Sequence, residues 1–304
     1  MKLADLHADI AFDLLEHKED KKRFENEHLP KLKTGEVAYC SIANYFDGSQ
    51  TLEQMKEMMD HALEMIENSD VELLKTAEDF KTKTGVFMTV EGMCGVKDNP
   101  EQWVQFMKDH HVLIASLCWN EANALAKGAK GDADYGLTDL GREVIAMMEE
   151  KNILLDVSHA SDDAFYDMMK VATKPVFATH SNARALCNAP RNLKDDQIDM
   201  IGKTGGLIGM NGFVNFISTE KEKQDAEHLA QHARYIADRI GVEHVALGFD
   251  FMDYFSDGDG KMAKGLESAA HAQNMVEALR HYFTEKEVEL ICYQNVVNFF
   301  VNYL

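Results

Sequence analysis

The sequence predicts an α/β protein folded as a (β/α)8 TIM barrel, because eight short apolar runs alternate with helix-like segments along 304 residues. The runs are rich in aliphatic and β-branched residues, which is typical of buried parallel strands. One barrel commonly uses a chain of this length, so we expect residues 1–304 to form a single domain. The runs are residues 3–9, 37–45, 86–91, 112–119, 153–159, 176–180, 207–211 and 245–250.

Helical periodicity fills most of the intervals between these runs. Apolar residues recur at helical spacing in residues 52–66, 140–150 and 229–240. Ser161 can cap a further helix over residues 161–172, which would connect the fifth run to the sixth. This order of elements is that of consecutive βαβ units.

Two stretches depart from the alternation. Residues 16–31 are dense in charge, and we expect them to form a solvated excursion after the first strand. Residues 253–265 contain Asp-Gly-Asp-Gly and follow the eighth strand, and we expect an active-site loop or lid there.

Composition excludes several classes of protein. The formal net charge of −21 argues against nucleic acid as a partner, since nucleic acids are bound by basic surfaces. No apolar run approaches the roughly 20 residues needed to span a bilayer. The first strand-like run begins at residue 3, which leaves no room for a signal peptide. The five cysteines are odd in number and include no Cys-x-x-Cys pair, which favours reduced thiols. We therefore expect a cytoplasmic protein with no membrane partner.

Histidines and carboxylates stand at the carboxyl ends of the predicted strands. In a TIM barrel these ends meet at one rim, and that rim carries the active site. The alternative is that each side chain is satisfied as a turn, cap or core residue. The candidates are His7 and Asp9 on the first strand, Glu91 on the third, His159 on the fifth, His180 on the sixth and Asp250 on the eighth.

This set of side chains is suited to a pair of zinc ions. His7 and Asp9 are two residues apart on a strand, so both can face one metal. Imidazole and carboxylate ligands suit zinc, and Glu91 could bridge two ions. Such a pair can hold a hydroxide near neutral pH and polarise a carbonyl, which leaves Asp250 free for proton transfer. The sequence thus predicts a barrel of the metal-dependent hydrolase type.

The motifs resemble those of the membrane dipeptidase (renal dipeptidase) family of zinc peptidases, and the chain looks like a cytoplasmic, microbial-type member. The resemblance runs in order from about residue 3 to residue 251, and it implies a (β/α)8 barrel. The matching motifs are Leu6-His7-Ala8-Asp9, Val90-Glu91-Gly92, Leu155-Asp156-Val157-Ser158-His159, Ala178-Thr179-His180-Ser181, Ala189-Pro190-Arg191-Asn192 and residues 244–251 (His-Val-Ala-Leu-Gly-Phe-Asp-Phe).

The resemblance implies two zinc ions per chain and a role for each ligand. His7 and Asp9 would bind one zinc ion, and His159 and His180 would bind the other. Glu91 would bridge the two ions, and we count it among the catalytic residues for that reason. A homodimer is also what the resemblance suggests.

The resemblance further implies how a substrate is held. Arg191 would bind the terminal carboxylate, for which a guanidinium fork is well suited, and Asp250 would carry a proton to the departing amine. Animal members of the family place a substrate-binding histidine at the end of the fourth strand, where this chain has Trp119 followed by Asn120. We expect these two residues to line the substrate pocket, with the indole offering one N–H donor and a large apolar face. Simple packing of Trp119 is the alternative.

The predicted function is that of a zinc-dependent dipeptidase, in which a metal-bound hydroxide attacks the peptide bond of a dipeptide. One alternative is another metallohydrolase on the same barrel, such as an N-acyl amino acid deacylase or a lactamase, because the fold supports many chemistries. The other is a non-catalytic metal-binding barrel.

Overall fold

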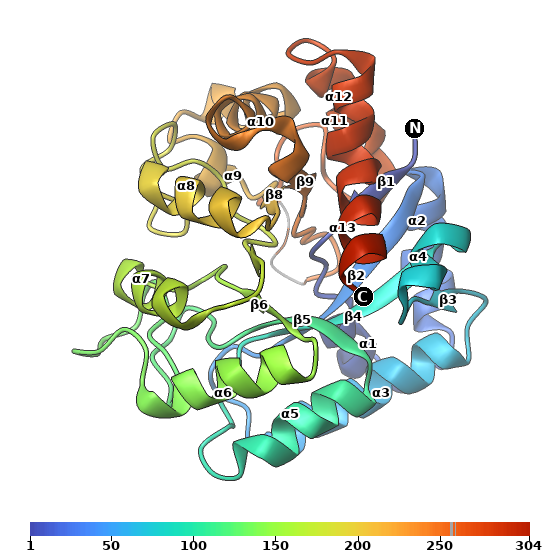
Figure 1. Cartoon of the computed structure of the whole chain (residues 1–304). Helices are drawn as coiled ribbons and strands as arrows, with labels where there is room; N and C mark the ends of the chain where they lie inside the picture. The colour runs from blue at the N-terminus through green and yellow to red at the C-terminus, as the bar shows by residue number, and fades with distance from the viewer. Residues whose placement is uncertain (256–257, 259) are drawn as a thin grey trace.

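The computed structural model describes residues 1–255, 258 and 260–304, and it has the (β/α)8 barrel that the sequence predicts. All strand pairs are parallel, and helices surround the strands (Figure 1). The strands are β1 (Leu3–Asp5), β2 (Val37–Tyr45), β3 (Glu72–Leu73), β4 (Gly85–Glu91), β5 (Val112–Ser116), β6 (Leu154–Asp156), β7 (Val176–Phe177), β8 (Ile208–Met210) and β9 (Val245–Leu247).

Eight of these strands form the barrel, in the order β7-β6-β5-β4-β2-β1-β9-β8. The seam between β7 and β8 is closed by a bridge between Ala178 and Ile208, with the Ala178 N–H donating to the carbonyl of Leu207 at 3.0 Å. The sequence did not predict β3, a two-residue strand that pairs with β4 outside this circuit.

The helices of the described residues follow most strands. Those expected from periodicity are present as α3, α6, α7 and α10, and the Ser161 side chain caps α7 by accepting the Ala164 N–H at 3.2 Å. None of the described helices combines the length and apolar composition needed to cross a bilayer. The α-helices are α1 (Ile10–Glu16), α2 (Leu29–Thr34), α3 (Leu52–Glu67), α4 (Ala77–Thr82), α5 (Pro100–Asp109), α6 (Asp139–Glu150), α7 (Asp162–Val171), α8 (Asp195–Thr204), α9 (Val214–Ile217), α10 (Ala226–Ile240), α11 (Gln273–Leu279), α12 (Glu285–Glu289) and α13 (Asn295–Tyr303), with short 3-10 or π turns at η1 (Phe24–His28), η2 (Lys221–Lys223), η3 (Val242–His244), η4 (Ala269–His271) and η5 (Leu290–Gln294).

The end of the barrel opposite the strand carboxyl ends is filled by α13 (Figure 1). Phe300 is fully buried, and its ring stacks on Phe80 with centroids 4.4 Å apart and lies 5.5 Å from Phe87 of β4. Burying an aromatic side chain of this size contributes roughly 2–3 kcal/mol. The chemistry of the barrel is therefore confined to the other rim.

The observed strands are shorter than the predicted runs at that rim. The first run was expected to reach residue 9, but β1 ends at Asp5, and Asp9 is instead the N-cap position of α1. We expected His7 and Asp9 to face one side because side chains alternate along a strand. That reason is wrong, since neither residue lies in β1. The two side chains still meet, because the chain turns directly after β1.

The charged stretch of residues 16–31 is not simply a solvated excursion. It contains η1 and the start of α2, and Phe24 and His28 within it are buried. Asp13 lies beneath them and forms ion pairs with Arg23 and His28. The density of charge in the sequence did not reveal these ion pairs, because the partners are 10 and 15 residues from Asp13.

The loop expected at residues 253–265 follows β9, and positions 256, 257 and 259 within it lie outside the described residues. Its Asp253 pairs with Lys31 of α2 at 2.7 Å. Met262 forms a bridge with Phe213. A lid function for this loop stays a prediction.

Candidate metal centre

The five side chains expected to bind metal converge at the carboxyl ends of β1, β4, β6 and β7. All are buried, with exposed fractions of 7% or less. Those fractions are low for charged and imidazole side chains, which are rarely buried without a specific partner. The five are His7, Asp9, Glu91, His159 and His180.

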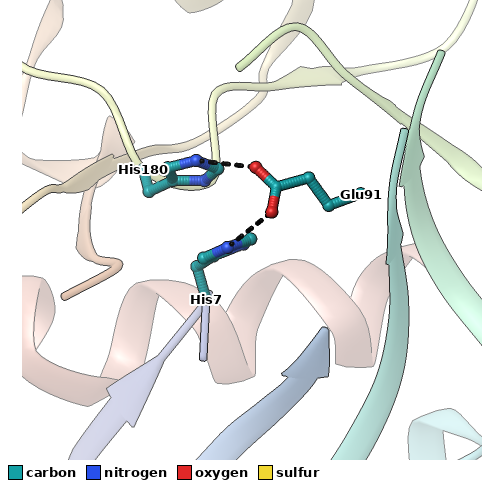
Figure 2. A group of neighbouring side chains, drawn as sticks. All are labelled: His7, Glu91 and His180. Atoms are coloured by element: carbon teal, nitrogen blue, oxygen red, sulfur yellow. Dashed lines mark ion pairs between the residues drawn. The ribbon is translucent and has the colours of Figure 1, made fainter. Parts of the chain in front are cut away.

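Glu91 lies between the histidines, as Figure 2 shows for two of them. Its Oε2 is 3.3 Å from Nε2 of His7, and its Oε1 is 2.6 Å from Nε2 of His159 and 3.3 Å from Nε2 of His180. One carboxylate oxygen thus faces each side of the cluster. Gly92 directly after Glu91 has φ +84°, and a side chain there would come within 3.0 Å of the Phe46 carbonyl, so glycine permits this turn.

Asp9 and Asp250 complete the side of the cluster near His7. Nε2 of His7 is 3.2 Å from Oδ1 of Asp9 and 4.0 Å from Oδ1 of Asp250. The residues therefore form two overlapping groups of potential ligands, His7 with Glu91 and His180, and His7 with Asp9 and Asp250.

Several buried atoms in the cluster have charged neighbours but no hydrogen bond. Among the residues that the structure describes, Nε2 of His7, Oδ1 of Asp9 and Oε1 of Glu91 accept or donate no hydrogen bond. Buried polar atoms are almost always paired, so such a concentration requires an explanation. A cation bound to nitrogen and oxygen donors would satisfy all three atoms, and this donor set suits zinc.

The electrostatics of the cluster favour positive charge near His7. Burial alone would lower the pKa of His7, but the charges of Glu91 and Asp9 outweigh it and raise the pKa well above its ordinary value. Burial raises the pKa of Asp250 to about 8, with Asp9 and Glu91 adding to the shift and His7 opposing it. A bound cation supplies the same positive charge that three adjacent carboxylates favour.

Two of these residues have an uncommon backbone conformation. His159 has φ +69° and Asp250 has φ +60°, both in the left-handed region. A residue other than glycine adopts this region at a cost of roughly 1–2 kcal/mol, and such residues concentrate at functional sites. The turn aims each side chain over the rim of the barrel directly after β6 and β9.

A model of the membrane dipeptidase family (Peptidase family M19) matches residues 1–302. The chain belongs to the membrane dipeptidase family. Among curated relatives, the dipeptidase tcpJ of Claviceps purpurea is 27% identical over 265 residues, which cover 86% of this chain and 60% of that protein. An uncharacterized protein in the pqqA 5′ region of Klebsiella pneumoniae is 38% identical over 143 residues, or 44% of this chain and 52% of that one. The matches thus span 60% and 52% of the length of these relatives.

A solved structure supports the family's fold. The metallo peptidase from Rhodobacter sphaeroides, liganded with a phosphinate mimic of the dipeptide L-Ala-D-Ala, superposes with a TM-score of 0.86 at 22% identity. The match covers 100% of this chain and 99% of that one. At this identity the likeness concerns the fold.

Trp119 and Asn120 lie beside the cluster. The Trp119 ring is half-buried, with its centroid 5.8 Å from that of His159 and 5.2 Å from that of Tyr45. Oδ1 of Asn120 lies 3.1 Å from Nδ1 of His159, and the expected contact of Asn120 with substrate stays a prediction. In this member of the family, Asn120 thus contacts the imidazole of a candidate ligand.

Arg191 lies in the loop after β7, next to His180. It is buried, its Nη2 donates to the His180 carbonyl at 3.3 Å, and its guanidinium lies 5.5 Å from the centre of the Phe216 ring. Its Nε has no hydrogen-bond partner among the described residues. A buried guanidinium with unused donors is well placed for a carboxylate.

Sequence reasoning missed Asn211, at the end of the seventh predicted strand. Its Nδ2 lies 3.1 Å from Oδ2 of Asp250 and 3.3 Å from the His180 carbonyl, and the side chain is fully buried. The available signal was its place at a strand end, which it shares with the histidines. An amide is not a usual catalytic group, so the search for imidazoles and carboxylates passed over it.

Proposed function

We propose that this protein is a zinc-dependent dipeptidase that hydrolyses the peptide bond of dipeptides at a binuclear centre. The observation that carries the proposal is Glu91, whose two oxygens face His7 on one side and His159 with His180 on the other. Membership of the dipeptidase family supports the reaction class. The chain would bind one ion with His7 and Asp9, the other with His159 and His180, and share both through Glu91.

When bound, the two ions would lower the pKa of a water molecule and polarise the scissile carbonyl. Arg191 would hold the C-terminal carboxylate of the dipeptide by paired hydrogen bonds and so fix the distance from that carboxylate to the scissile bond. The site would thus offer a guanidinium for the carboxylate of a zwitterionic dipeptide and carboxylates for its ammonium group. This arrangement would favour short peptides with free termini.

Asp250 would transfer the proton to the departing amine. A carboxylate beside the proposed metal site can take up a proton and pass it to a more basic nitrogen. Asn211 donates to Oδ2 of Asp250, which leaves Oδ1 on the side of His7. Trp119 would form an apolar wall of the substrate pocket with Tyr45.

The test is amine release from a panel of L-L and L-D dipeptides beside their N-acetylated forms, with zinc-loaded and chelator-treated protein. Cleavage of free dipeptides alone, abolished by the chelator, is the expected result. Trp119 favours one competing reaction, because a pocket without the family's histidine could accept N-acyl amino acids. Cleavage of acetylated compounds would establish that deacylase, and silence across the panel would refute hydrolysis of dipeptides.

A further inference from the structure

A chain of buried hydrogen bonds runs behind His180. The hydroxyl oxygen of Thr179 lies 2.9 Å from Nδ1 of His180 and 2.5 Å from Oδ2 of Asp156. All three side chains are at least 96% buried. Nδ1 is the ring nitrogen that does not face Glu91, so this chain contacts His180 from the side away from the cluster.

The direction of the protons in this chain follows from Asp156. Its Oδ1 accepts the N–H groups of Ser158 at 2.8 Å and Thr179 at 3.0 Å, and its Oδ2 accepts the Thr179 hydroxyl. The single hydroxyl proton of Thr179 is therefore donated to Oδ2 of Asp156. Thr179 Oγ1 must then accept from Nδ1–H of His180, which leaves Nε2 with a free lone pair directed at Glu91.

Asn120 has the equivalent relation to His159. Its Oδ1 can only accept, so Nδ1 of His159 carries the proton and Nε2 carries the lone pair. The two Nε2 atoms lie 3.0 Å apart, and two lone pairs at that distance repel unless a cation binds them. Oε1 of Glu91 faces both nitrogens and adds negative charge.

The backbone holds Thr179 in place. A side chain on Gly209 of β8 would come within 1.9 Å of the Thr179 carbonyl oxygen, and one on Gly248 after β9 within 1.8 Å. Only glycine at both positions lets these two segments approach the end of β7 so closely. The hydroxyl of Thr179 therefore has little freedom to leave its position between His180 and Asp156.

We propose that Asp156 with Thr179, and Asn120 separately, are positioning residues that hold His180 and His159 as the Nδ1–H tautomers. Both Nε2 atoms thereby keep a lone pair that can bind a metal ion next to Glu91. The inference rests on the proposed binuclear centre, and it assigns no contact with substrate to these three residues. Partners of this kind raise the affinity of a site because a histidine held in the correct tautomer needs no rearrangement on binding.

The test compares Thr179→Val, which removes the hydroxyl at nearly constant shape, with Thr179→Ser, which keeps it. Competition with a chromophoric chelator measures zinc affinity without any substrate. We expect Thr179→Val to weaken zinc binding by about 10- to 100-fold and Thr179→Ser to retain most of it. Thr89→Val is the matched control, because Thr89 is also buried in the barrel and hydrogen-bonded to Ser41 at 2.6 Å. It should lower the melting temperature without weakening zinc binding.

Nitrogen-15 NMR spectra of the histidine rings in metal-free protein identify the tautomers directly and provide a second test. We expect Nδ1–H for His180 in the native protein and a mixture of tautomers in Thr179→Val. Native zinc affinity in Thr179→Val, or Nε2–H at His180 in the native protein, would overturn the proposal. If Thr179→Val does not fold, Asn120→Ala and the acceptor-retaining Asn120→Asp provide the same comparison at His159. A native protein that shows Nδ1–H but binds no zinc would refute the metal centre while supporting the hydrogen-bond assignment.

Discussion

Two buried clusters of histidine and carboxylate follow β1, and they differ in how their polar atoms are satisfied. In the first, Glu91 and Asp9 each have an oxygen without a hydrogen bond among the described residues. In the second, Asp13 of α1 accepts from Arg23 at both oxygens, each at 2.8 Å, and contacts Nε2 of His28 at 2.7 Å. The histidine and the carboxylates are buried in both clusters, so their burial does not distinguish a binding site from a structural ion pair.

The pKa values of the two clusters diverge for the same reason. Burial alone would raise the pKa of Asp13, but the hydrogen bonds and charges of His28 and Arg23 lower it below its ordinary range. Asp250 is partly buried next to other carboxylates, and its pKa rises instead. A cluster whose internal charges balance stabilises the fold, whereas one with excess negative charge is prepared for a cation from outside.

The largest effect should come from Glu91→Gln, which removes the charge that the two proposed zinc sites would share. We expect dipeptide hydrolysis to fall by several orders of magnitude, and the rise in melting temperature on adding zinc to disappear. Kinetic assays and thermal unfolding with and without zinc measure both. A variant that is still stabilised by zinc would contradict the central place given to Glu91.

Asp250→Asn should come next, with kcat lower by about 10²–10⁴-fold, which is the usual contribution of a proton donor. Zinc binding should persist, since Asp250 is proposed to act on the substrate. His159→Ala is the companion variant, in which we expect zinc binding and activity to fall together in a folded protein. Unchanged turnover in either variant would remove that residue from the mechanism.

In the second cluster the effect should be on stability. Asp13→Ala leaves His28 and Arg23 without their shared partner, and we expect the free energy of unfolding to fall by about 3 kcal/mol. Urea unfolding measures it, and the kcat of the remaining folded protein should change little. The control is Glu57→Ala, which breaks an exposed pair with Lys18 and should cost less than about 1 kcal/mol. Equal losses in the two variants would mean that burial of the cluster adds nothing.

The smallest effect is the pH dependence of that stability. A carboxyl group whose pKa is lowered in the folded state stabilises the protein above its unfolded pKa, and that contribution is lost as the pH falls through the folded pKa. The difference in unfolding free energy between native protein and Asp13→Ala should therefore be constant above about pH 5 and shrink below about pH 4. If the difference in unfolding free energy grew as the pH fell, the pKa of Asp13 would not be lowered by folding.

The barrel and the meeting of five side chains could be predicted because both follow from strand ends. Parallel strands bring their carboxyl ends to one rim, so position in the sequence was enough to bring His7 and His180 together. The contact of Asn120 with His159 could not be predicted in the same way, because the position of a residue after a strand does not fix which neighbour its side chain faces. The burial of Phe24 was missed because hydrophobic periodicity is weak in a short π turn such as η1.

The left-handed backbone at His159 and Asp250 has a consequence for how this protein would evolve. Glycine relieves that conformation, and asparagine adopts it more readily than most side chains. A library selected only for heat resistance should therefore accumulate glycine or asparagine at these two positions, each exchange raising stability while discarding a group proposed for catalysis. If His159 and Asp250 are retained despite this gain in stability, selection acts on turnover rather than on the fold.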